Sequence, residues 1–317
     1  VTFNRSKKGV DYFSSLDPKN LKKFISQINK VKTSFGINQL NFSKSEKKYR
    51  NEVKKIWYLN KNLKKNKRIS HNDLLMLRPP SQNVAPAFIE KFEKINLNRN
   101  YKKNTCLTHS ASSENKVGAI IVSRLKSQRL PNKALKLINN EPLITHLIKR
   151  LKLAKNVDKI VLATTKNNED LKICNLAKNN KINFFRGDEK NVLKRMHDAA
   201  KKFNCNIVIR VTGDDILIDP SYLDKLIKYH LDSNLEYSHN KELPGGTEVE
   251  IFNLDILRFL LNTIIDKNNT EYLTLFIQKH LDQFITGSLK VSKKHKSKKS
   301  LTIDTYEDYI FVKKFLK

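Results

Sequence analysis

Four cations follow a short apolar run, with no acidic residue among them. The run is VGAIIV, residues 117–122, and the cations are Arg124, Lys126, Arg129 and Lys133. Guanidinium and ammonium groups bind phosphate oxygens well. The loop lacks the glycines of a Walker or dinucleotide-binding fingerprint, so side chains rather than bare backbone would hold a phosphate group here. In a chain this rich in lysine, a solvated turn is the alternative interpretation.

Carboxylates follow two other apolar segments. Asp214 and Asp215 end the segment VIRVTGDD, and Asp304 ends the segment SLTID. Paired carboxylates at a strand end suit a hard divalent cation. We predict that Asp214 and Asp304 hold one Mg²⁺ between them, provided that the second segment inserts as a strand beside the first. The alternative for Asp304 is a helix N-cap.

From residue 117 onward, segments typical of strands alternate with segments typical of helices. The expected strands are 117–122, 157–165, 182–187 and 205–215, and the expected helices are 142–156, 169–180 and 191–203. This alternation predicts an α/β fold, with a mainly parallel sheet and helices on both faces. Ligands bind beyond the carboxyl ends of such strands. The cations after the first strand and the carboxylates at 214–215 therefore belong to one edge of the sheet.

The composition limits the classes of protein to consider. A length of 317 residues with 39% apolar residues suggests about two domains with ordinary cores. No run of 18 apolar residues or signal peptide is present, so no membrane span is expected. The three scattered cysteines favour a reducing compartment, which we expect to be the cytoplasm. The first residue is Val1 rather than Met, which suggests a piece of a longer protein.

The chain is strongly basic. It has 62 Lys and Arg against 31 Asp and Glu, a formal net charge of +31. A nucleic-acid-binding protein is the class that this charge suggests by itself. The excess is spread along the whole chain, and few aromatic residues are interleaved with it, which favours a solvated surface. We therefore expect no specific nucleic-acid partner.

The first third of the chain has a different organisation. Residues 16–35 predict an amphipathic helix with Asp17 as its N-cap and Pro18 in its first turn. Further along, the sequence predicts a polar linker at 41–55, a compact unit at about 55–110 and a small-polar linker at 110–116. Within the compact unit we expect strands around IWYLN and LLMLRPP, and a helix at 86–95.

Several motifs together resemble those of sugar-activating cytidylyltransferases. AIIVSRLKSQRLPNKAL is similar to their signature, roughly A-R-x-x-S-x-R-L-P-x-K, and TGDDILIDP resembles their Gly-Asp metal motif. TIDTYEDY resembles their late V-D-T-P-E-D segment. FFRGDEKNVLKRMHDAAKKFN and PGGTEVEIFNLDIL point to the spore-coat polysaccharide branch, akin to the sialic-acid and keto-deoxy-octulosonate enzymes. The resemblance covers residues 117–317 and implies a Rossmann-like nucleotidyltransferase domain.

The resemblance also implies roles for individual positions. The residues that match the loop holding the triphosphate of CTP are Arg124, Ser127, Arg129 and Lys133. Thr212 matches a nucleotide contact, Asp214 and Asp304 match the metal carboxylates, and Arg210, Glu248 and Glu250 match positions on the sugar side. Arg124, Lys133 and Asp214 would act directly in catalysis. Asp215 stands where the family often has Cys or Glu, which leaves open whether it shares the metal.

The N-terminal third resembles part of another family. GVDYFSSLDPKNLKKFI is similar to the last barrel helix of sialic-acid synthases, and KKIWYLNKNLKKNKRISHNDLLMLRPPSQNVAP resembles their antifreeze-like (SAF) domain. The implied domains are 1–54, the tail of a TIM barrel with a linker; 55–110, the SAF domain; and 117–317, the cytidylyltransferase. Arg78 matches the arginine that holds the N-acyl sugar in a partner subunit's site. Most of the barrel is absent and Tyr12 replaces a metal-binding His, so we expect this half to be inactive alone.

The leading hypothesis is therefore an enzyme. It would activate an acidic sugar, a sialic-acid-like nonulosonic acid, with CTP and Mg²⁺, giving a CMP-sugar and pyrophosphate for surface polysaccharide biosynthesis. A homodimer is among the assemblies that the resemblance allows, because both families tend to dimerise. The alternatives are a non-catalytic carbohydrate-binding or regulatory fusion, and a nucleotide-sugar glycosyltransferase. The latter would normally carry an Asp-x-Asp motif, which GDD is not.

Overall fold

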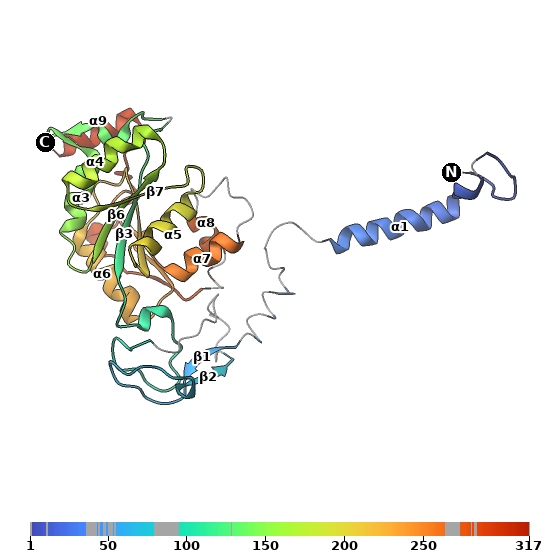
Figure 1. Cartoon of the computed structure of the whole chain (residues 1–317), viewed down its shortest axis with the longest axis horizontal. Helices are drawn as coiled ribbons and strands as arrows, with labels where there is room; N and C mark the ends of the chain where they lie inside the picture. Colours follow the sequence, from blue (N-terminus) through green and yellow to red (C-terminus); the bar gives the residue numbers. More distant parts are fainter. Residues whose placement is uncertain are drawn as a thin grey trace. The chain divides into compact units, whose positions relative to one another are not determined.

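The chain divides into two compact units, Val1–Phe42 and Ser43–Lys317 (Figure 1). The computed structural model describes residues 2–10, 12–35, 43, 45–46, 49, 53, 55–78, 95–127, 129–263, 273–279, 281 and 284–316. The predicted helix at 86–95 lies outside the described residues, apart from its last position. No helix in the described part of the chain is long and apolar enough to cross a membrane.

The described residues of the first unit form one long helix, α1 (Pro18–Ser34), after the 3₁₀ helix Tyr12–Ser14. The predicted cap is present: Oδ1 of Asp17 accepts a hydrogen bond from the backbone N–H of Asn20 at 2.8 Å. The apolar side chains of α1 remain about half exposed, for example Phe24 at 49% and Val31 at 54%. Within the described part of the first unit, α1 therefore has little to pack against.

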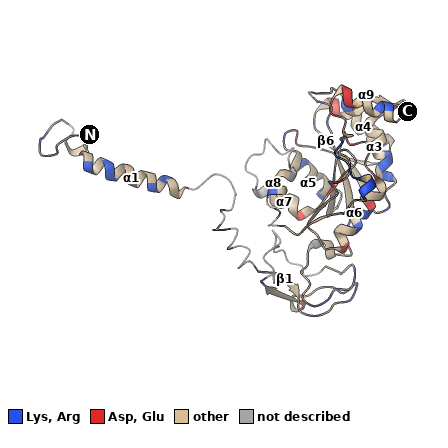
Figure 2. Ribbon diagram, turned by 180° about the vertical axis from the view of Figure 1, so that it is seen from behind, with Lys and Arg blue, Asp and Glu red and all other residues tan. Residues whose placement is uncertain are grey.

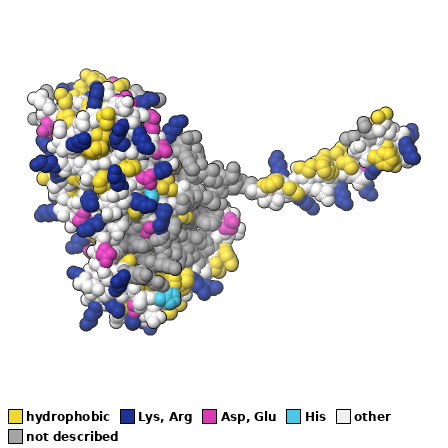
Figure 3. Space-filling view, in the orientation of Figure 1, with side chains coloured by type: hydrophobic (Ala, Val, Ile, Leu, Met, Phe, Trp, Pro, Cys, Tyr) yellow, Lys and Arg dark blue, Asp and Glu magenta, His cyan; other side chains and the backbone are white. Residues whose placement is uncertain are grey.

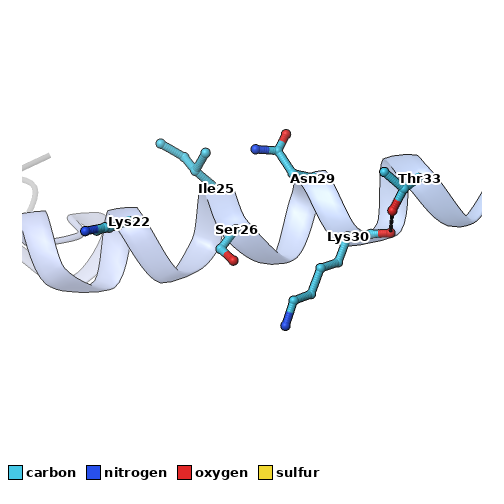
Figure 4. Close-up of a pocket in the computed structure, with 6 residues that line it drawn as sticks. All are labelled: Lys22, Ile25, Ser26, Asn29, Lys30 and Thr33. Atoms are coloured by element: carbon cyan, nitrogen blue, oxygen red, sulfur yellow. Dashed lines mark hydrogen bonds between the residues drawn. The ribbon is translucent and has the colours of Figure 1, made fainter.

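Figure 4 shows one side of α1 in close-up. The side chains drawn are Lys22, Ile25, Ser26, Asn29, Lys30 and Thr33. The single hydrogen bond drawn runs from the hydroxyl of Thr33 to the carbonyl oxygen of Lys30, at 2.7 Å, within the helix itself. Since all these residues come from one helix, they form an open surface that cannot enclose a ligand.

The second unit begins with a small domain built on two antiparallel strands. These are β1 (Ile56–Leu59) and β2 (Leu74–Leu77), paired in the register Ile56↔Leu77, and both were expected from the sequence. The 3₁₀ helix His71–Asp73 leads into β2. Buried apolar residues form the core of this domain: Leu59, Leu63, Ile69, Leu74, Leu97, Tyr101, Leu107 and Ala111.

The predicted linker at 110–116 is wrong for its first half, which packs against the larger domain. The 3₁₀ helix His109–Ala111 lies here, and Ser110 and Ser112 are buried. The hydroxyl oxygen of Ser110 lies 2.6 Å from the carbonyl oxygen of Leu235 and 2.9 Å from Oδ1 of Asn253, and its proton can be donated to either acceptor. Small polar residues are typical of linkers, but their hydroxyls also satisfy buried backbone groups, and this segment uses them in that way.

We expect Thr108→Val to destabilise the protein by about 1–3 kcal/mol. The hydroxyl of Thr108 is buried and donates to Oδ1 of Asn234 at 2.7 Å, so the nearly isosteric valine leaves buried acceptors without this donor. The control is Thr105→Val, because the hydroxyl of Thr105 bonds the carbonyl oxygen of Lys102 at an exposed site. Chemical denaturation of both variants measures the difference, and equal stabilities would contradict this account.

Within the residues that the structure describes, the larger domain contains a seven-stranded sheet. Its strands are β3 (Val117–Val122), β6 (Lys159–Thr165), β7 (Asn183–Gly187), β8 (Ile207–Thr212), β9 (Tyr237–His239), β10 (Glu250–Asn253) and β11 (Thr286–Ser288). Their order is β11-β9-β10-β8-β3-β6-β7. Among these described strands only β10 runs antiparallel to its neighbours, so the prediction of a mainly parallel sheet is confirmed. A short hairpin, β4 (Leu137–Ile138) with β5 (Glu141–Pro142), lies outside this sheet.

Helices cover both faces of the sheet, as predicted (Figure 1). One buried core includes residues of α3 (Leu143–Lys152), α4 (Leu171–Asn179), α6 (Pro220–Asp232) and α9 (Tyr306–Phe315). A second core includes residues of α5 (Val192–Lys202), α7 (Leu254–Thr263) and α8 (Leu273–Lys279). The central strands contribute to both cores, because successive side chains of a strand point to opposite faces. This is the architecture of a Rossmann-like fold.

Charged side chains are distributed over the larger unit rather than gathered in one place. On the face shown in Figure 3, basic side chains alternate with acidic and apolar ones. Figure 2 shows acidic and basic positions at opposite ends of α9, where Glu307 and Asp308 occupy the first turn and Lys313 and Lys314 the last. This arrangement complements the helix dipole.

Candidate active site

Three charged side chains from distant parts of the chain meet at the carboxyl edge of the sheet. Lys133 lies in the loop after β3, Asp214 in the turn after β8, and Asp304 just before α9. The Nζ atom of Lys133 lies 2.6 Å from Oδ2 of Asp214 and 3.1 Å from Oδ1 of Asp304. Arg129 supplies a second cation, 3.0 Å from Oδ2 of Asp304. The structure therefore brings both predicted carboxylates to one ammonium group.

Asp304 is not the N-cap of α9. Thr305 has that position, and it forms a capping box with Asp308. The prediction that Asp304 ends a strand of the sheet is also wrong, because residues 301–304 belong to no strand. The backbone N–H of Ile303 instead donates to the carbonyl oxygen of Asp214 at 3.2 Å. This backbone contact helps to align the segment with the end of β8.

A close backbone approach holds the same segment in place from its other side. Ser300 forms an isolated bridge with Gly245, and the N–H of Leu301 donates to the carbonyl oxygen of Gly245 at 2.7 Å. Gly246 has a positive φ of 83°, and a Cβ there would lie 2.6 Å from the backbone nitrogen of Thr302. Any side chain at this glycine would push the segment, and Asp304 with it, away from the sheet.

Asp214 has an oxygen atom suited to a cation. Its Oδ1 is buried and has no hydrogen-bond partner among the described residues, whereas Oδ2 is bound by Lys133. Burial alone would raise the pKa of Asp214, but the Lys133 ammonium more than offsets it, so the pKa lies below its ordinary value. An unpaired buried carboxylate oxygen is costly unless a cation or donor binds it. The residues present therefore fit a divalent cation.

The described residues supply few other ligands. No group of three or more His, Cys, Asp or Glu side chains comes together among them. A cation held by Asp214 and Asp304 would thus complete its shell with water or phosphate oxygens, as Mg²⁺ commonly does.

The carboxylate of Asp215 has different hydrogen-bond partners from that of Asp214. Its two carboxylate oxygens accept hydrogen bonds from the hydroxyls of Thr212 and Thr302, the latter at 2.8 Å. Burial, together with the neighbouring Asp214, raises the pKa of Asp215 to about 6. Asp215 therefore fastens the segment before α9 to β8, which favours Asp214 as the metal ligand. The hydroxyl of Thr212, expected to contact nucleotide, is here directed at Asp215.

The remaining loop residues line the same edge. Arg124 and Ser127 are half-buried, and Arg129 is 67% exposed. The backbone N–H of Ser127 donates to the carbonyl oxygen of Leu125 at 2.9 Å, which closes a tight turn. Gly213, at the end of β8, packs against this loop: a Cβ on it would lie 2.6 Å from the hydroxyl oxygen of Ser123. The loop is therefore seated directly on the turn that carries Asp214.

A second polar cluster lies on β8, β9 and β10. Glu250 pairs in register with Arg210 of β8 and His239 of β9. Oε2 of Glu250 lies 3.1 Å from NH1 of Arg210, and its Oε1 lies 3.2 Å from Nζ of Lys241 and accepts the hydroxyl of Tyr237 at 2.7 Å. The sequence had indicated Arg210 and Glu250 but not Lys241 or Tyr237, because no local pattern distinguishes them from other lysines and core aromatics.

Glu248 stands beside this cluster and is half-buried. Burial raises its pKa to about 7; the Lys241 charge opposes this shift, and the Glu250 and Asp215 charges add to it. A group whose pKa is raised in the folded state stabilises the fold at low pH, and that stabilisation is lost as the pH rises through the folded-state value.

We therefore expect Glu248→Gln to raise the melting temperature at pH 8 relative to the parent protein and to change it little at pH 4.5. The glutamine stays neutral at both values, whereas Glu248 ionises between them, from an ordinary pKa of 4.5 to about 7 when folded. Thermal melts of both proteins at the two pH values measure the effect. An equal difference at both would show that burial of this charge is not its cause.

Arg78 is placed elsewhere. It is exposed and directly follows β2 in the small domain. That domain contacts the larger one through residues such as Asn234, which precede β9, and therefore at the amino end of this strand. The Lys133 cluster lies at the carboxyl ends of the parallel strands. The described contacts thus do not join Arg78 to the other predicted site residues.

Comparison with known proteins establishes the class. Residues 118–317 match the family model described as "Cytidylyltransferase". The chain therefore belongs to the cytidylyltransferase family, and the resemblance derived from its motifs is confirmed for this part. Residues before 118 lie outside the match, so the resemblance of the N-terminal third to a synthase barrel and a SAF domain stays a prediction.

Individual proteins similar to this chain include two from curated sequences and one of known structure. The chain is 33% identical over 195 residues to the uncharacterized protein MJ1063 of Methanocaldococcus jannaschii, covering 61% of this chain and 80% of that one. It is 30% identical over 201 residues to the spore coat polysaccharide biosynthesis protein SpsF of Bacillus subtilis, covering 61% and 83%. A cytidylyltransferase structure from Leptospira borgpetersenii shares 32% identity with a TM-score of 0.60, covering 63% and 86%.

Proposed function

We propose that this protein transfers CMP from CTP to a hydroxyl group of an acidic sugar and releases pyrophosphate. The observation that carries the proposal is the convergence of Lys133, Asp214 and Asp304 at the carboxyl edge of the sheet. The buried, unpartnered Oδ1 of Asp214 adds a place for a cation. Cations from one loop and carboxylates from two others are the parts that a metal-assisted phosphoryl-transfer site requires.

The mechanism follows from the charges. The hydroxyl oxygen of the sugar attacks the α-phosphorus in line and loses its proton to water, and the bond between the α-phosphorus and the oxygen that bridges to the β-phosphate breaks, so that pyrophosphate leaves. Asp214 and Asp304 would hold Mg²⁺, whose charge, when it is bound, offsets the charge that develops on the phosphate oxygens. Arg124, Arg129 and Lys133 would stabilise the departing pyrophosphate. No covalent enzyme intermediate is required.

The cluster around Glu250 supports an acidic sugar. Arg210 lies on β8 and Lys241 follows β9, on either side of β10, and Glu250 of β10 forms ion pairs with both cations. Glu248 lies beside them. A relative from Pelobacter propionicus, 30% identical over 116 residues, covering 37% of this chain and 45% of that one, is named 3-deoxy-manno-octulosonate cytidylyltransferase. By analogy, the carboxylate of the sugar would bind at Arg210 and Lys241.

A sialic-acid-like nonulosonic acid is the proposed substrate, with surface polysaccharide as the pathway's product. The support is the similarity of the N-terminal third to sialic-acid synthases, together with the name of SpsF. On the same basis we retain the proposed domains: 1–54 as the barrel tail with a linker, 55–110 as the SAF domain and 117–317 as the transferase. Arg78 would then serve a synthase site in a partner subunit.

A pyrophosphate-release assay tests the proposal. The protein is incubated with Mg²⁺, each of four nucleoside triphosphates and a panel of sialic-type and octulosonic acids. We expect release with CTP and at least one nonulosonic acid, and mass spectrometry should detect the CMP-sugar. Release with octulosonic acids alone would overturn the assignment of the sugar. Equal use of UTP, or no release with any pair, would overturn the proposed reaction.

A further inference from the structure

Asp170 is a buried carboxylate that joins two loops at the candidate site. It ends the 3₁₀ helix Asn168–Asp170, just before α4, and is only 1% exposed. Oδ1 accepts the backbone N–H of Leu125 at 2.8 Å. Oδ2 accepts the hydroxyl of Thr164 at 2.9 Å, the N–H of Thr165 at 3.2 Å and the hydroxyl of Thr165. The end of β6 and the loop after β3 are therefore held by one side chain.

Leu125 makes several of the contacts that hold the loop after β3, residues 123–133, which carries Arg124 and Lys133. Its side chain is buried in the core, its N–H is bound by Asp170, and its carbonyl oxygen accepts the N–H groups of Ser127 at 2.9 Å and Asn132 at 3.3 Å. Asn132 adopts a left-handed conformation, with φ of 53°, and directly precedes Lys133. A continuous series of contacts thus runs from Asp170 through the Leu125 peptide groups to the residue before Lys133.

The position of this contact in the loop matters for chemistry. The Leu125 N–H belongs to the peptide bond that follows Arg124, and the turn closed on the Leu125 carbonyl leads into Lys133. If Leu125 shifts, both cations shift relative to Asp214, whose turn packs against Ser123 of the same loop through Gly213. Preorganised charges are effective only when their geometry is fixed before reaction.

We propose that Asp170 is a positioning residue for the nucleotide-binding loop. Its carboxylate fixes Leu125 and thereby directs Arg124 and Lys133 toward the triphosphate. The proposal rests on the proposed CTP-dependent function. A carboxylate suits this position because each of its oxygens accepts, and every group that faces it is a donor. An asparagine would turn its NH₂ group toward at least one of these donors.

The test compares Asp170→Asn with Asp158→Asn in the full chain. Asp158 is the matched control, because its Oδ2 accepts the N–H of Val117 at 2.7 Å, at the opposite end of the strand that leads into the loop. We expect Asp170→Asn to lower kcat/KM for CTP by roughly tenfold to a hundredfold, mainly through KM, with the KM for the sugar unchanged. Asp158→Asn should leave both KM values within about twofold of the parent, since the contact that it removes lies away from the reacting edge.

Hydrogen exchange, measured by mass spectrometry without substrates, gives a readout that does not depend on activity. Asp170→Asn should speed exchange in residues 123–133 and leave the strands β8 and β10 unchanged, and Asp158→Asn should not affect the loop. Unchanged loop exchange together with an unchanged KM for CTP would overturn the proposal. If the parent protein does not use CTP but the loop of Asp170→Asn still exchanges faster than that of the parent, only the proposed function is rejected.

A second variant covers the case in which Asp170→Asn does not fold. Thr165→Val removes the hydroxyl that donates to Oδ2 of Asp170 and keeps the Leu125 contact. It should shift loop exchange and the KM for CTP in the same direction by a smaller amount. Parent-like values for both would contradict the role of Asp170.

Discussion

Substitution of Asp214 by alanine is expected to abolish CMP-sugar formation while leaving the fold intact. The side chain lies at the rim of the sheet, and its loss leaves Lys133 paired with Asp304 at 3.1 Å, so no buried cation is left without a partner. It also removes the one described carboxylate oxygen in this cluster that is buried and unbound. Loss of a charge-stabilising group in such sites costs on the order of 10³-fold in kcat.

The measurement is pyrophosphate release at saturating CTP and sugar, with thermal melting to verify folding. Asp219→Ala is the control, because Asp219 caps α6 by accepting the N–H of Tyr222 at 2.9 Å, five residues along the chain from Asp214. This control should lose about 1 kcal/mol of stability and keep its activity. Activity of Asp214→Ala within tenfold of the parent would remove the basis for the metal assignment.

Replacement of Lys133 by methionine is expected to have two opposite effects. It should lower kcat/KM for CTP by on the order of 10²- to 10³-fold, because the triphosphate loses a cation. In the absence of nucleotide it should raise the affinity for Mn²⁺. The Lys133 ammonium forms ion pairs with Asp214 at 2.6 Å and Asp304 at 3.1 Å, and it therefore occupies the place where a divalent cation would bind. A side chain without charge no longer competes with the metal for Asp214 and Asp304.

Isothermal titration with Mn²⁺ and steady-state kinetics with CTP separate these effects. Lys126→Met is the matched control, since Lys126 belongs to the same loop but is exposed. Its metal affinity and CTP kinetics should stay close to those of the parent protein. If Lys133→Met bound Mn²⁺ no more tightly than the parent and used CTP as the parent does, the ion pairs of Lys133 would have a structural role only.

The sequence by itself determined the architecture of the larger domain. Apolar runs such as 117–122, alternating with amphipathic segments such as 143–152, permit burial only as strands covered by helices on both faces. It also indicated which edge of the sheet carries the candidate site, since the cations near Lys133 and the carboxylate of Asp214 both follow strands that run in parallel. The periodicity of apolar residues is local, and the tendency of ligands to bind beyond the carboxyl ends of parallel strands is general. Neither requires information about distant contacts.

Only the tertiary structure decided which side chains meet. Asp304 joins Asp214 through a segment outside the sheet that is held by contacts at Ile303 and Gly246, not through the strand that its apolar residues predicted. Asp170 binds the Leu125 amide 45 positions away along the chain. The segment 110–112 has the small residues of a linker, but it is buried because residues distant in sequence, such as Leu235, pack against it. Such contacts depend on packing between distant segments, and no local pattern of residues encodes them.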